Sequence, residues 1–448
     1  MNYSGARSWP VLLVAVASLV LGACTQAPSA ASASRDPAVD SSPMAAAFSS
    51  PGAVPASVAE ARPVTARHGM VATAQHLATQ VGVDILKQGG NAIDAAVAVG
   101  YALAVVHPCC GNLGGGGFML IRLADGHKAF LNFREKAPLA ATADMYQNPQ
   151  GHVIPGLSTR SWKSIGVPGT VMGLNTALKR YGTMSLEQVM APAIKLAAQG
   201  FILRPGDVGI LRYGTQKFRG QPNVARIFLN DGEPYQVGDR LVQRQLAATL
   251  KMIANHGASA FYDGPIAKAI VKASRAHGGV LSLKDFKRYN VEWERPIHCR
   301  YRSYDIWSSP PPSSGGTTMC EILNIVSGYP LSQFGFHSVD AVHFLVEAMR
   351  YAYADRNTKL GDPDFIDNPI DKLLSAEHAR AIRAKIDPKR PTPSSAIEGG
   401  QGLTEGRETT HYSIVDESGN AAAVTYTINL AFGSGHIAGD TGFFLNDE

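Results

Sequence analysis

The sequence lacks the features that mark several large classes of protein. It contains no run of lysine and arginine and no basic stripe with interleaved aromatic residues, and its formal net charge is +5 over 448 residues. A nucleic-acid partner is therefore not expected, because such a partner requires a concentrated positive surface. Internal repeats are also absent, which argues against a repeat architecture. With 45% hydrophobic and 17% charged residues, the composition is typical of a globular domain that buries a large core.

Motifs for metal ions and nucleotides are missing as well. The histidines are scattered, without a His-Glu-x-x-His or paired pattern, so we predict no metal at a catalytic site and no cofactor. The segment Gly361-Asp-Pro-Asp364 lacks the spaced acids and central glycine of a calcium loop and is interpreted as a turn. The glycine run 114–117 precedes a strand-like segment and lacks the Gly-Lys-Ser/Thr ending of a phosphate loop. These glycines are interpreted as positions of close backbone packing or positive φ.

Cysteine is scarce, with five residues in the whole chain. Cys109 and Cys110 are adjacent, Cys299 and Cys320 are distant, and no zinc or redox spacing is present. A disulfide is permitted in an exported protein, but the sequence does not assign one. We interpret these four residues as small buried side chains.

One apolar run, from Pro10 to Cys24, follows Arg7 at the N-terminus and is typical of a secretory signal. Its end, Leu21-Gly-Ala-Cys24, resembles a bacterial lipobox, so residues 1–24 are predicted to be a lipoprotein signal with the lipid on Cys24. A plain cleaved signal, which leaves a soluble periplasmic protein, is the alternative. An uncleaved anchor is disfavoured because the run is shorter than the ~20 residues that span a bilayer. Residues 25–63, rich in Ala, Ser and Pro, are predicted to be a flexible tether.

Hydrophobic periodicity and turn residues predict the elements of the folded body. Gly89 and Gly90 end a first helix, and Asn91 with Asp94 predicts a capping box for a second helix that is apolar on nearly every side and should be buried. Two strands follow the glycine run, joined by the hairpin turn 123–127. The predicted helices are 73–86, 92–106, 185–199, 241–256, 317–327 and 340–355, the last with its aromatic and aliphatic residues inward, and the predicted strands are 118–122 and 128–133.

A threonine-rich hairpin is predicted near the end of the chain. The segments 409–416 and 420–429 flank Glu417-Ser-Gly419, and glycine is last, where a three-residue hairpin loop needs a left-handed conformation. This register sets Thr409 opposite Thr427. Because residues two apart share a face of a strand, one face should collect Thr409, His411, Ser413, Thr425, Thr427 and Asn429.

Two interpretations of these threonines are open. Cross-strand threonine pairs are ordinary stabilisers of a sheet. Alternatively, a threonine becomes a nucleophile when the chain is cut just before it, because its new α-amine, with a pKa near ~8, then accepts the hydroxyl proton.

The order of motifs along the chain resembles one family, the γ-glutamyltranspeptidases, which are N-terminal-nucleophile hydrolases. The resemblance runs from about Arg67 to Glu448. Its landmarks are Asn91-Ala-Ile-Asp-Ala-Ala-Val97, Gly111-Asn-Leu-Gly-Gly-Gly-Gly-Phe118, Phe133-Arg-Glu-Lys-Ala-Pro138, Gly166-Val-Pro-Gly-Thr170, Pro310-Pro-Pro-Ser-Ser-Gly-Gly316, Tyr353-Ala-Asp-Arg356 and Thr409-Thr-His-Tyr-Ser413.

The resemblance implies an α+β fold, the four-layer αββα sandwich, in one domain. The large subunit would be residues 64–408 and the small subunit would begin with 409–448, after self-cleavage between Glu408 and Thr409. The expected substrates are glutathione and other γ-glutamyl compounds, and the acyl-enzyme passes to water, an amino acid or a dipeptide. A cephalosporin or glutaryl acylase, which shares the fold and the nucleophile, is a rival function.

The resemblance also implies residue roles. Thr409 is the nucleophile and Thr427 the threonine that hydrogen-bonds it. Arg134 binds the α-carboxylate of the glutamyl group, for which a planar guanidinium is suited. Asn429 and Glu448 hold the α-ammonium group.

The sequence departs from the family in its length, since the family continues well past Glu448. The part of the family sequence that lies beyond Glu448 carries a further acid for the α-ammonium group, a serine pair, the glycine pair of the oxyanion hole and several strands of the sheet. Loss of one oxyanion donor typically costs ~10²-fold to 10³-fold in rate. We therefore expect an uncovered sheet face, an open sheet edge and little turnover by these 448 residues alone, with a truncated non-catalytic family member as the alternative.

Overall fold

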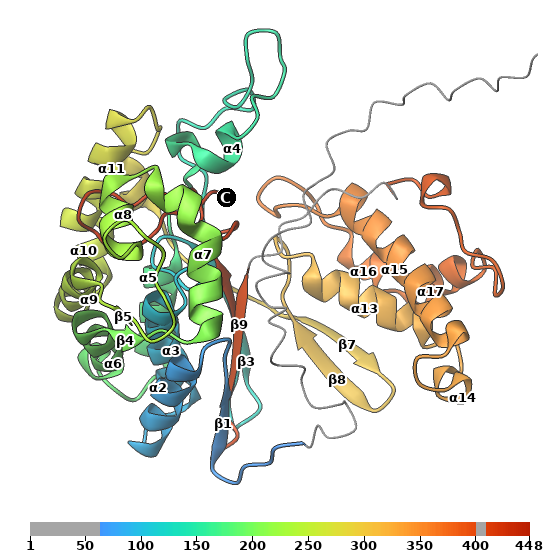
Figure 1. The fold of residues 1–448 in the computed structure, drawn as a ribbon. Coiled ribbons are helices and arrows are strands. Elements are labelled where there is room, and N and C mark those ends of the chain that lie inside the picture. Colours follow the sequence, from blue (N-terminus) through green and yellow to red (C-terminus); the bar gives the residue numbers. More distant parts are fainter. Residues whose placement is uncertain (1–62, 400–408) are drawn as a thin grey trace, which may run out of the picture. The chain divides into compact units, whose positions relative to one another are not determined.

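The hairpin lies in the middle of an antiparallel sheet built from both ends of the folded chain (Figure 1). The computed structural model describes residues 63–399 and 409–448; the predicted signal segment, Cys24, nearly all of the tether and Glu408 lie outside these ranges. The sheet has six strands in the order β1-β9-β10-β2-β3-β6, and each neighbouring pair is antiparallel. The strands are β1 (Gly69–Ala72), β9 (Thr410–Asp416), β10 (Ala421–Thr427), β2 (Gly116–Arg122), β3 (Lys128–Asn132) and β6 (Glu292–Glu294).

Two helices, α2 (His76–Lys87) and α3 (Ala92–Val106), pack on one face of this sheet (Figure 1). The predicted capping box of Asn91 and Asp94 is confirmed, and every residue of α3 is buried. The hydroxyl of Tyr412 donates to the carbonyl of Ala96 at 3.0 Å, and the hydroxyl of Tyr426 donates to Gly100 at 2.8 Å. Each strand of the hairpin is thus fixed to α3 by a buried tyrosine.

The opposite face of the hairpin is open to solvent. His411 and Ser413 are exposed, and Ala423 and Thr425 are half-buried. The outer strands β1 and β6 leave two edges to the sheet. The expectation of an uncovered face and an open edge is therefore confirmed for the part of the chain that the structure describes.

Two helices begin three residues later than predicted, and each follows a short strand. The residues before α2 pair with β9 as strand β1, and the side chain of Gln75 then caps the helix by accepting the N–H of Leu77 at 2.6 Å. Similarly, β5 (Arg240–Leu241) pairs with β4 (Phe201–Ile202), so the predicted helix 241–256 is α9 (Arg244–His256).

The remaining helices of this part share the main hydrophobic core with the sheet. This core contains a cluster of aromatic rings. The centre of the Phe218 ring lies 4.8 Å from that of Phe432, and the ring centres of Phe228 and Phe444 are 4.9 Å apart. These helices are α5 (Thr170–Tyr181), α6 (Leu186–Gln199), α7 (Pro205–Arg219), α8 (Pro222–Phe228), α10 (Ala258–Tyr262), α11 (Pro265–Ala276) and α12 (Leu283–Arg288). The short helix α4 (Leu157–Arg160) has no buried residue and lies outside this core.

The segment from residue 297 to residue 386 has a hydrophobic core of its own, which includes Ile325, Phe344 and Ile382. It comprises β7 (Ile297–Tyr301), β8 (Tyr304–Ser308), α13 (Gly315–Val326), α14 (Leu331–Phe334), α15 (Val339–Lys359), α16 (Ile370–Leu373) and α17 (Ala376–Arg383). The prediction for α15 is partly wrong, because Leu345 and Tyr353 are 42% and 43% exposed. This helix has apolar residues on more than one side, so it cannot turn all of them toward one core.

A disulfide between Cys299 and Cys320 joins β7 to α13. The interpretation of these two residues as unconnected small side chains is therefore wrong. They are far apart in sequence, and only the packing of α13 on the β7–β8 hairpin brings them together. The predicted α+β class is confirmed, and none of the helices in the described ranges combines the length and the hydropathy that a bilayer span requires.

Candidate active site

The register of the hairpin is the one predicted from the sequence. Tyr426 pairs with Thr410 and Thr425 with His411, and the same register extended by one residue sets Thr409 opposite Thr427. At the turn, the N–H of Asp416 donates to Asn420 at 3.0 Å, and Gly419 adopts φ +85°. Thr409 is exposed and lies immediately before the first paired residue of β9.

Thr427 ends strand β10 and is held by the residues that follow it. Its Oγ1 accepts the N–H of Asn429 at 2.9 Å, while Asn429 takes a left-handed conformation with φ +68°. Asparagine tolerates this conformation better than most residues. The side chain of Thr427 is therefore buried with a defined orientation at the end of the sheet.

The glycine run explains how β2 approaches the threonines. A Cβ added to Gly115 would lie 2.0 Å from the carbonyl oxygen of Thr427, and one added to Gly117 would lie 2.3 Å from that of Thr425. Neither glycine has a positive φ. The interpretation of close backbone packing is confirmed, and only glycine permits it here.

The predicted convergence of hydroxyls on the open face is confirmed around His411. Its Nδ1 lies 2.7 Å from Oγ1 of Thr425, and its Nε2 lies 3.0 Å from Oγ of Ser413. Partial burial of the ring lowers the pKa of this imidazole, which favours its neutral form. The sequence indicated that His411 shares the face but gave it no chemical role.

Arg134 follows strand β3 and binds a carboxylate with both terminal nitrogens. Its Nη1 donates to Oε1 of Glu448 at 3.1 Å and its Nη2 to Oε2 at 2.6 Å. Its guanidinium carbon also lies 5.9 Å from the centre of the Phe118 ring. This bidentate geometry is the one expected for an α-carboxylate ligand.

Asn429 and Glu448, the two residues predicted to hold an ammonium group, lie in one tightly connected segment. The Nδ2 of Asn429 donates to the carbonyl of Asp447 at 2.9 Å, and the N–H of Leu430 donates to Oδ1 of Asp447 at 3.0 Å. Burial raises the pKa of Asp447 to about 7. The structure thus brings Arg134, Asn429 and Glu448 to one place, next to the end of β10.

Glu135 is a charged residue of this site that the sequence analysis missed. Its side chain is 2% exposed, and Oε2 lies 3.7 Å from Nη1 of Arg134. Within the described ranges neither carboxylate oxygen has a hydrogen-bond partner of good geometry, although the backbone of Gly116 and of Glu135 itself lies close enough to favour the charged form slightly. Burial, together with the charge of Glu448, raises the pKa of Glu135 to about 8. The motif Phe133-Arg-Glu places it beside Arg134, but the pattern carries no signal of its burial.

We expect Glu135→Gln to change how stability depends on pH. Because the pKa of Glu135 is higher in the folded chain than its ordinary value of 4.5, the protonated side chain stabilises the fold relative to the ionised one. This stabilisation is complete below about pH 4.5 and is lost as the pH rises through about 8. Between about pH 5 and pH 9, the free energy of unfolding of the natural chain should therefore fall relative to that of the variant by a few kcal/mol, at about 1.4 kcal/mol for each pKa unit. Urea unfolding at several pH values measures the difference, and parallel curves for the two proteins would contradict the assignment.

Asn112 is the second residue that the sequence analysis missed, and it ties the glycine run to the threonine strand. Its Nδ2 donates at 2.9 Å to the carbonyls of both Cys110 and Thr427. Its Oδ1 accepts the N–H of Gly115 at 2.9 Å and the hydroxyl of Thr170 at 2.6 Å. The side chain is 3% exposed, so these bonds replace water completely.

Replacing Asn112 with aspartate should be more damaging than its small change in shape suggests. The second carboxylate oxygen would face the carbonyls of Cys110 and Thr427 without a proton to donate, inside the core. We expect the free energy of unfolding to drop by about 2–4 kcal/mol, the range for broken buried networks. Chemical denaturation measures this drop. The matched control is Asn255→Asp on the exposed end of α9, which should change the value by less than about 0.5 kcal/mol.

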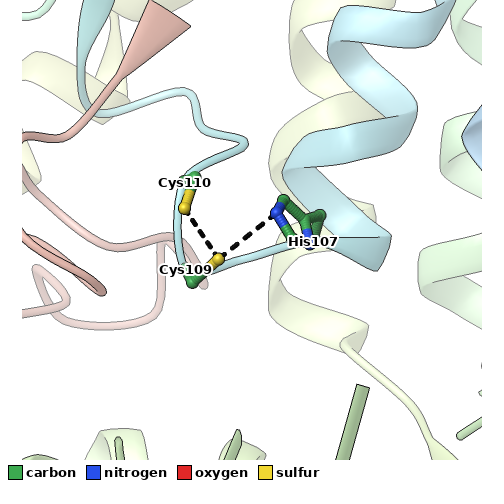
Figure 2. A group of neighbouring side chains, drawn as sticks. All are labelled: His107, Cys109 and Cys110. Atoms are coloured by element: carbon green, nitrogen blue, oxygen red, sulfur yellow. Dashed lines mark hydrogen bonds between the residues drawn. The ribbon is translucent and has the colours of Figure 1, made fainter. Parts of the chain in front are cut away.

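Cys109 and Cys110 follow the end of α3 (Figure 2), and the carbonyl of Cys110 accepts the hydrogen bond from Asn112. Their sulfur atoms are 2.8 Å apart, and Nε2 of His107 lies 3.4 Å from the Sγ of Cys109. Both cysteines are buried, as predicted. These three side chains could hold a thiophilic ion, and in the described ranges a second group with metal-ligand geometry is Glu321, Asp355 and His378.

Comparison with known proteins agrees with this geometry. A model of the Gamma-glutamyltranspeptidase family matches residues 78–448. The glutathione hydrolase proenzyme of Pseudomonas sp. (strain A14) is 53% identical over 382 residues, which cover 85% of this chain and 66% of that protein. The chain thus spans slightly less than two thirds of this relative. A relative named Acylase ACY 1 proenzyme, from Pseudomonas sp. (strain V22), is 38% identical over 386 residues, covering 85% of this chain and 68% of the relative.

A solved structure gives the same result for the fold. The crystal structure of Helicobacter pylori gamma-glutamyltranspeptidase superposes with a TM-score of 0.74 at 43% identity, covering 78% of this chain and 100% of that chain. The predicted N-terminal-nucleophile hydrolase fold is confirmed. Since the family match extends over most of the sequence, the chain belongs to the γ-glutamyltranspeptidase family.

Proposed function

We propose that this chain is the precursor of a glutathione hydrolase and γ-glutamyl acyltransferase whose nucleophile is Thr409. The observation that carries the proposal is the register of the hairpin, which sets Thr409 opposite Thr427. Arg134, which binds a carboxylate, follows strand β3 of the same sheet, and β3 is separated from β10 only by β2. A nucleophile and a carboxylate anchor at one end of a sheet suit a substrate that carries an amide and an α-carboxylate.

The first reaction would be self-cleavage before Thr409. The hydroxyl of Thr409 attacks the carbonyl carbon of Glu408, the C–N bond breaks, and the acyl group passes from nitrogen to the threonine oxygen as an ester. Water then splits the ester and leaves Thr409 with a free α-amine. Thr427 is proposed to hydrogen-bond the nucleophile, and its own orientation is fixed by the N–H of Asn429.

In the second reaction, the freed amine would accept the proton of the Thr409 hydroxyl as the oxygen attacks a γ-glutamyl amide. The amine of the leaving group receives that proton, and a γ-glutamyl ester remains on Thr409. Water resolves this ester to glutamate, and an amino acid or a dipeptide resolves it to a new γ-glutamyl amide. The name of the Pseudomonas relative, glutathione hydrolase proenzyme, supports glutathione as a substrate and a precursor form of the chain.

Substrate binding is proposed to use the present pair of Arg134 and Glu448. The carboxylate of Glu448 stands in for the substrate's α-carboxylate on the guanidinium fork. When substrate binds, its α-carboxylate takes this place on Arg134, and the carboxylate of Glu448 becomes available for the α-ammonium group together with Asn429. Burial lowers the pKa of Arg134, but the neighbouring Glu135 and Glu448 outweigh it and raise this pKa above its ordinary value.

The cellular location remains a proposal that rests on the sequence alone. The lipobox-like segment ending at Cys24 supports a periplasmic protein held to a membrane by a lipid, with residues 25–63 as the tether. Detergent partitioning of the natural protein, compared with that of Cys24→Ser, tests this proposal.

A pair of chromogenic amides tests the substrate class. A γ-glutamyl anilide and a glutaryl anilide differ only in the α-amino group, so they report on the proposed ammonium site. We expect kcat/KM to favour the γ-glutamyl compound by at least about 100-fold, since a site built for a polar group rejects an analogue that lacks it. Equal or faster release from the glutaryl anilide would instead support an acylase.

A further inference from the structure

Three side chains with metal-binding atoms meet where helices α13, α15 and α17 pack together. Nε2 of His378 lies 2.7 Å from Oδ2 of Asp355 and 3.1 Å from Oε1 of Glu321. All three ligand atoms lie within 4.8 Å of one another. None of these residues has a role in the proposed reaction.

The burial of this cluster sets it apart from ordinary surface ion pairs. The side chain of Glu321 is 1% exposed, and those of Asp355 and His378 are each 15% exposed. Two carboxyl groups this close together in a protein interior cannot both stay ionised unless a cation compensates them; otherwise one of them holds a proton, because burying a charge without a partner is costly. Lys359 provides part of this charge, with Nζ 2.6 Å from Oδ1 of Asp355.

We propose that Glu321, Asp355 and His378 form a binding site for one divalent transition-metal ion of the Zn²⁺ class, with water as a further ligand. The ion would join three helices that share a small core. Its role would be structural, separate from the chemistry at Thr409.

The geometry needs little adjustment to hold such an ion. Zinc binds imidazole nitrogen at about 2.0–2.1 Å and carboxylate oxygen at about 2.0–2.2 Å, so neighbouring ligand atoms of a tetrahedral site are about 3.3 Å apart. The distances from Nε2 of His378 are 2.7 Å and 3.1 Å. Nε2 of His378 therefore has to separate from each carboxylate oxygen by well under 1 Å as the ion enters, and the two carboxylate oxygens already lie within 4.8 Å of each other.

The ligand types select the class of ion. One imidazole and two carboxylates suit Zn²⁺, Co²⁺ or Mn²⁺, whereas Ca²⁺ requires six or more oxygens and Cu⁺ prefers sulfur. The surroundings also orient the ligands. Lys359 binds Oδ1 of Asp355, which leaves Oδ2 directed at the ion, and the disulfide at Cys320 fixes the backbone one residue before Glu321.

Metal titration of the 448-residue chain without substitutions, after treatment with a chelator, tests the proposal. We expect one equivalent of Co²⁺ to bind at micromolar concentration or tighter with visible ligand-field bands, and Zn²⁺ to displace it and raise Tm. Absence of this binding would overturn the proposal and would mean that His378 is only an ion-pair partner of the two carboxylates.

Isosteric variants then locate the ion. His378→Gln and Glu321→Gln should each weaken Co²⁺ binding by at least about 100-fold, since even an outer-sphere partner contributes 10–100-fold. The matched control is His298→Gln, because His298 also lies 3.0 Å from a carboxylate, that of Asp305, but both side chains are about half exposed. This control should bind Co²⁺ like the natural chain.

Two outcomes of the variant series would contradict the site. One is Co²⁺ binding that survives in both His378→Gln and Glu321→Gln. The other is a spectrum dominated by thiolate charge transfer and insensitive to those variants, which would place the ion at Cys109 and Cys110. Far-ultraviolet circular dichroism of each variant shows whether a loss of binding reflects the site or a loss of fold.

Discussion

Replacing Thr409 with alanine is expected to leave the chain uncut and to lower γ-glutamyl release by at least about 10³-fold. The alanine has no hydroxyl to attack the preceding carbonyl or the substrate amide, so both reactions lose their nucleophile. Loss of a catalytic nucleophile in other hydrolases costs this much or more. Because Thr409 is exposed and precedes the first paired residue of β9, the substitution should not disturb the sheet. Gel electrophoresis and release of a chromogenic aniline measure the two effects.

Thr409→Ser is the matched control, since it keeps the hydroxyl and removes only a methyl group. Cleavage of this variant should continue at a reduced rate. Thr410→Ser, one residue further, alters a buried side chain of the same strand and should leave both reactions in place. If the alanine variant still divided into two chains and released glutamate, Thr409 would not be the nucleophile.

Arg134→Gln is expected to raise KM for γ-glutamyl substrates and to lower kcat/KM by about 100-fold or more. The natural side chain makes two charge-assisted bonds to a carboxylate, and each such bond contributes about 1.5–3 kcal/mol. Glutamine keeps much of the length of the side chain, but it has neither the positive charge nor the two parallel N–H donors of the guanidinium group. Steady-state kinetics with a γ-glutamyl anilide measures the change.

A substrate without the α-carboxylate shows whether the loss occurs at the proposed contact. The natural chain should strongly prefer a γ-glutamyl anilide over a 4-aminobutyryl anilide, which lacks the α-carboxylate. Arg134→Gln should lose this preference, because without Arg134 the α-carboxylate of the substrate no longer has an interaction to lose. Arg219→Gln is the control, since Arg219 forms a surface ion pair with Glu233. Equal preference in the natural chain and in Arg134→Gln would exclude Arg134 as the carboxylate anchor.

The sequence predicted well those features that depend on neighbouring residues. The capping box of Asn91 and Asp94, the hairpin turn around Gly419 and the register of Thr409 with Thr427 all follow from local chemistry. The resemblance to the family then supplied Arg134, Asn429 and Glu448, which the structure brings together. No spacing rule could have placed these three residues in one site.

Features that depend on distant segments were missed. Strand β1 (Gly69–Ala72) pairs with β9, more than 300 residues later, and the sequence analysis did not predict this strand. The raised pKa of Glu135 depends on its burial against segments such as that of Gly116 and on the charge of Glu448, which lie far from it in sequence. Likewise, Glu321, Asp355 and His378 come from three separate helices and leave no metal-binding pattern in the sequence. In each case the cause is tertiary packing, which short-range periodicity does not record.

The N-terminus of the mature protein tests the central claim most directly. Purified natural chain should be incubated until its pattern on a denaturing gel is constant and then analysed by intact mass spectrometry and N-terminal sequencing. The account predicts two pieces, one of which begins at Thr409 with an unblocked amine. A chain that stays whole, or that is cut elsewhere, while releasing glutamate from γ-glutamyl amides would contradict the account.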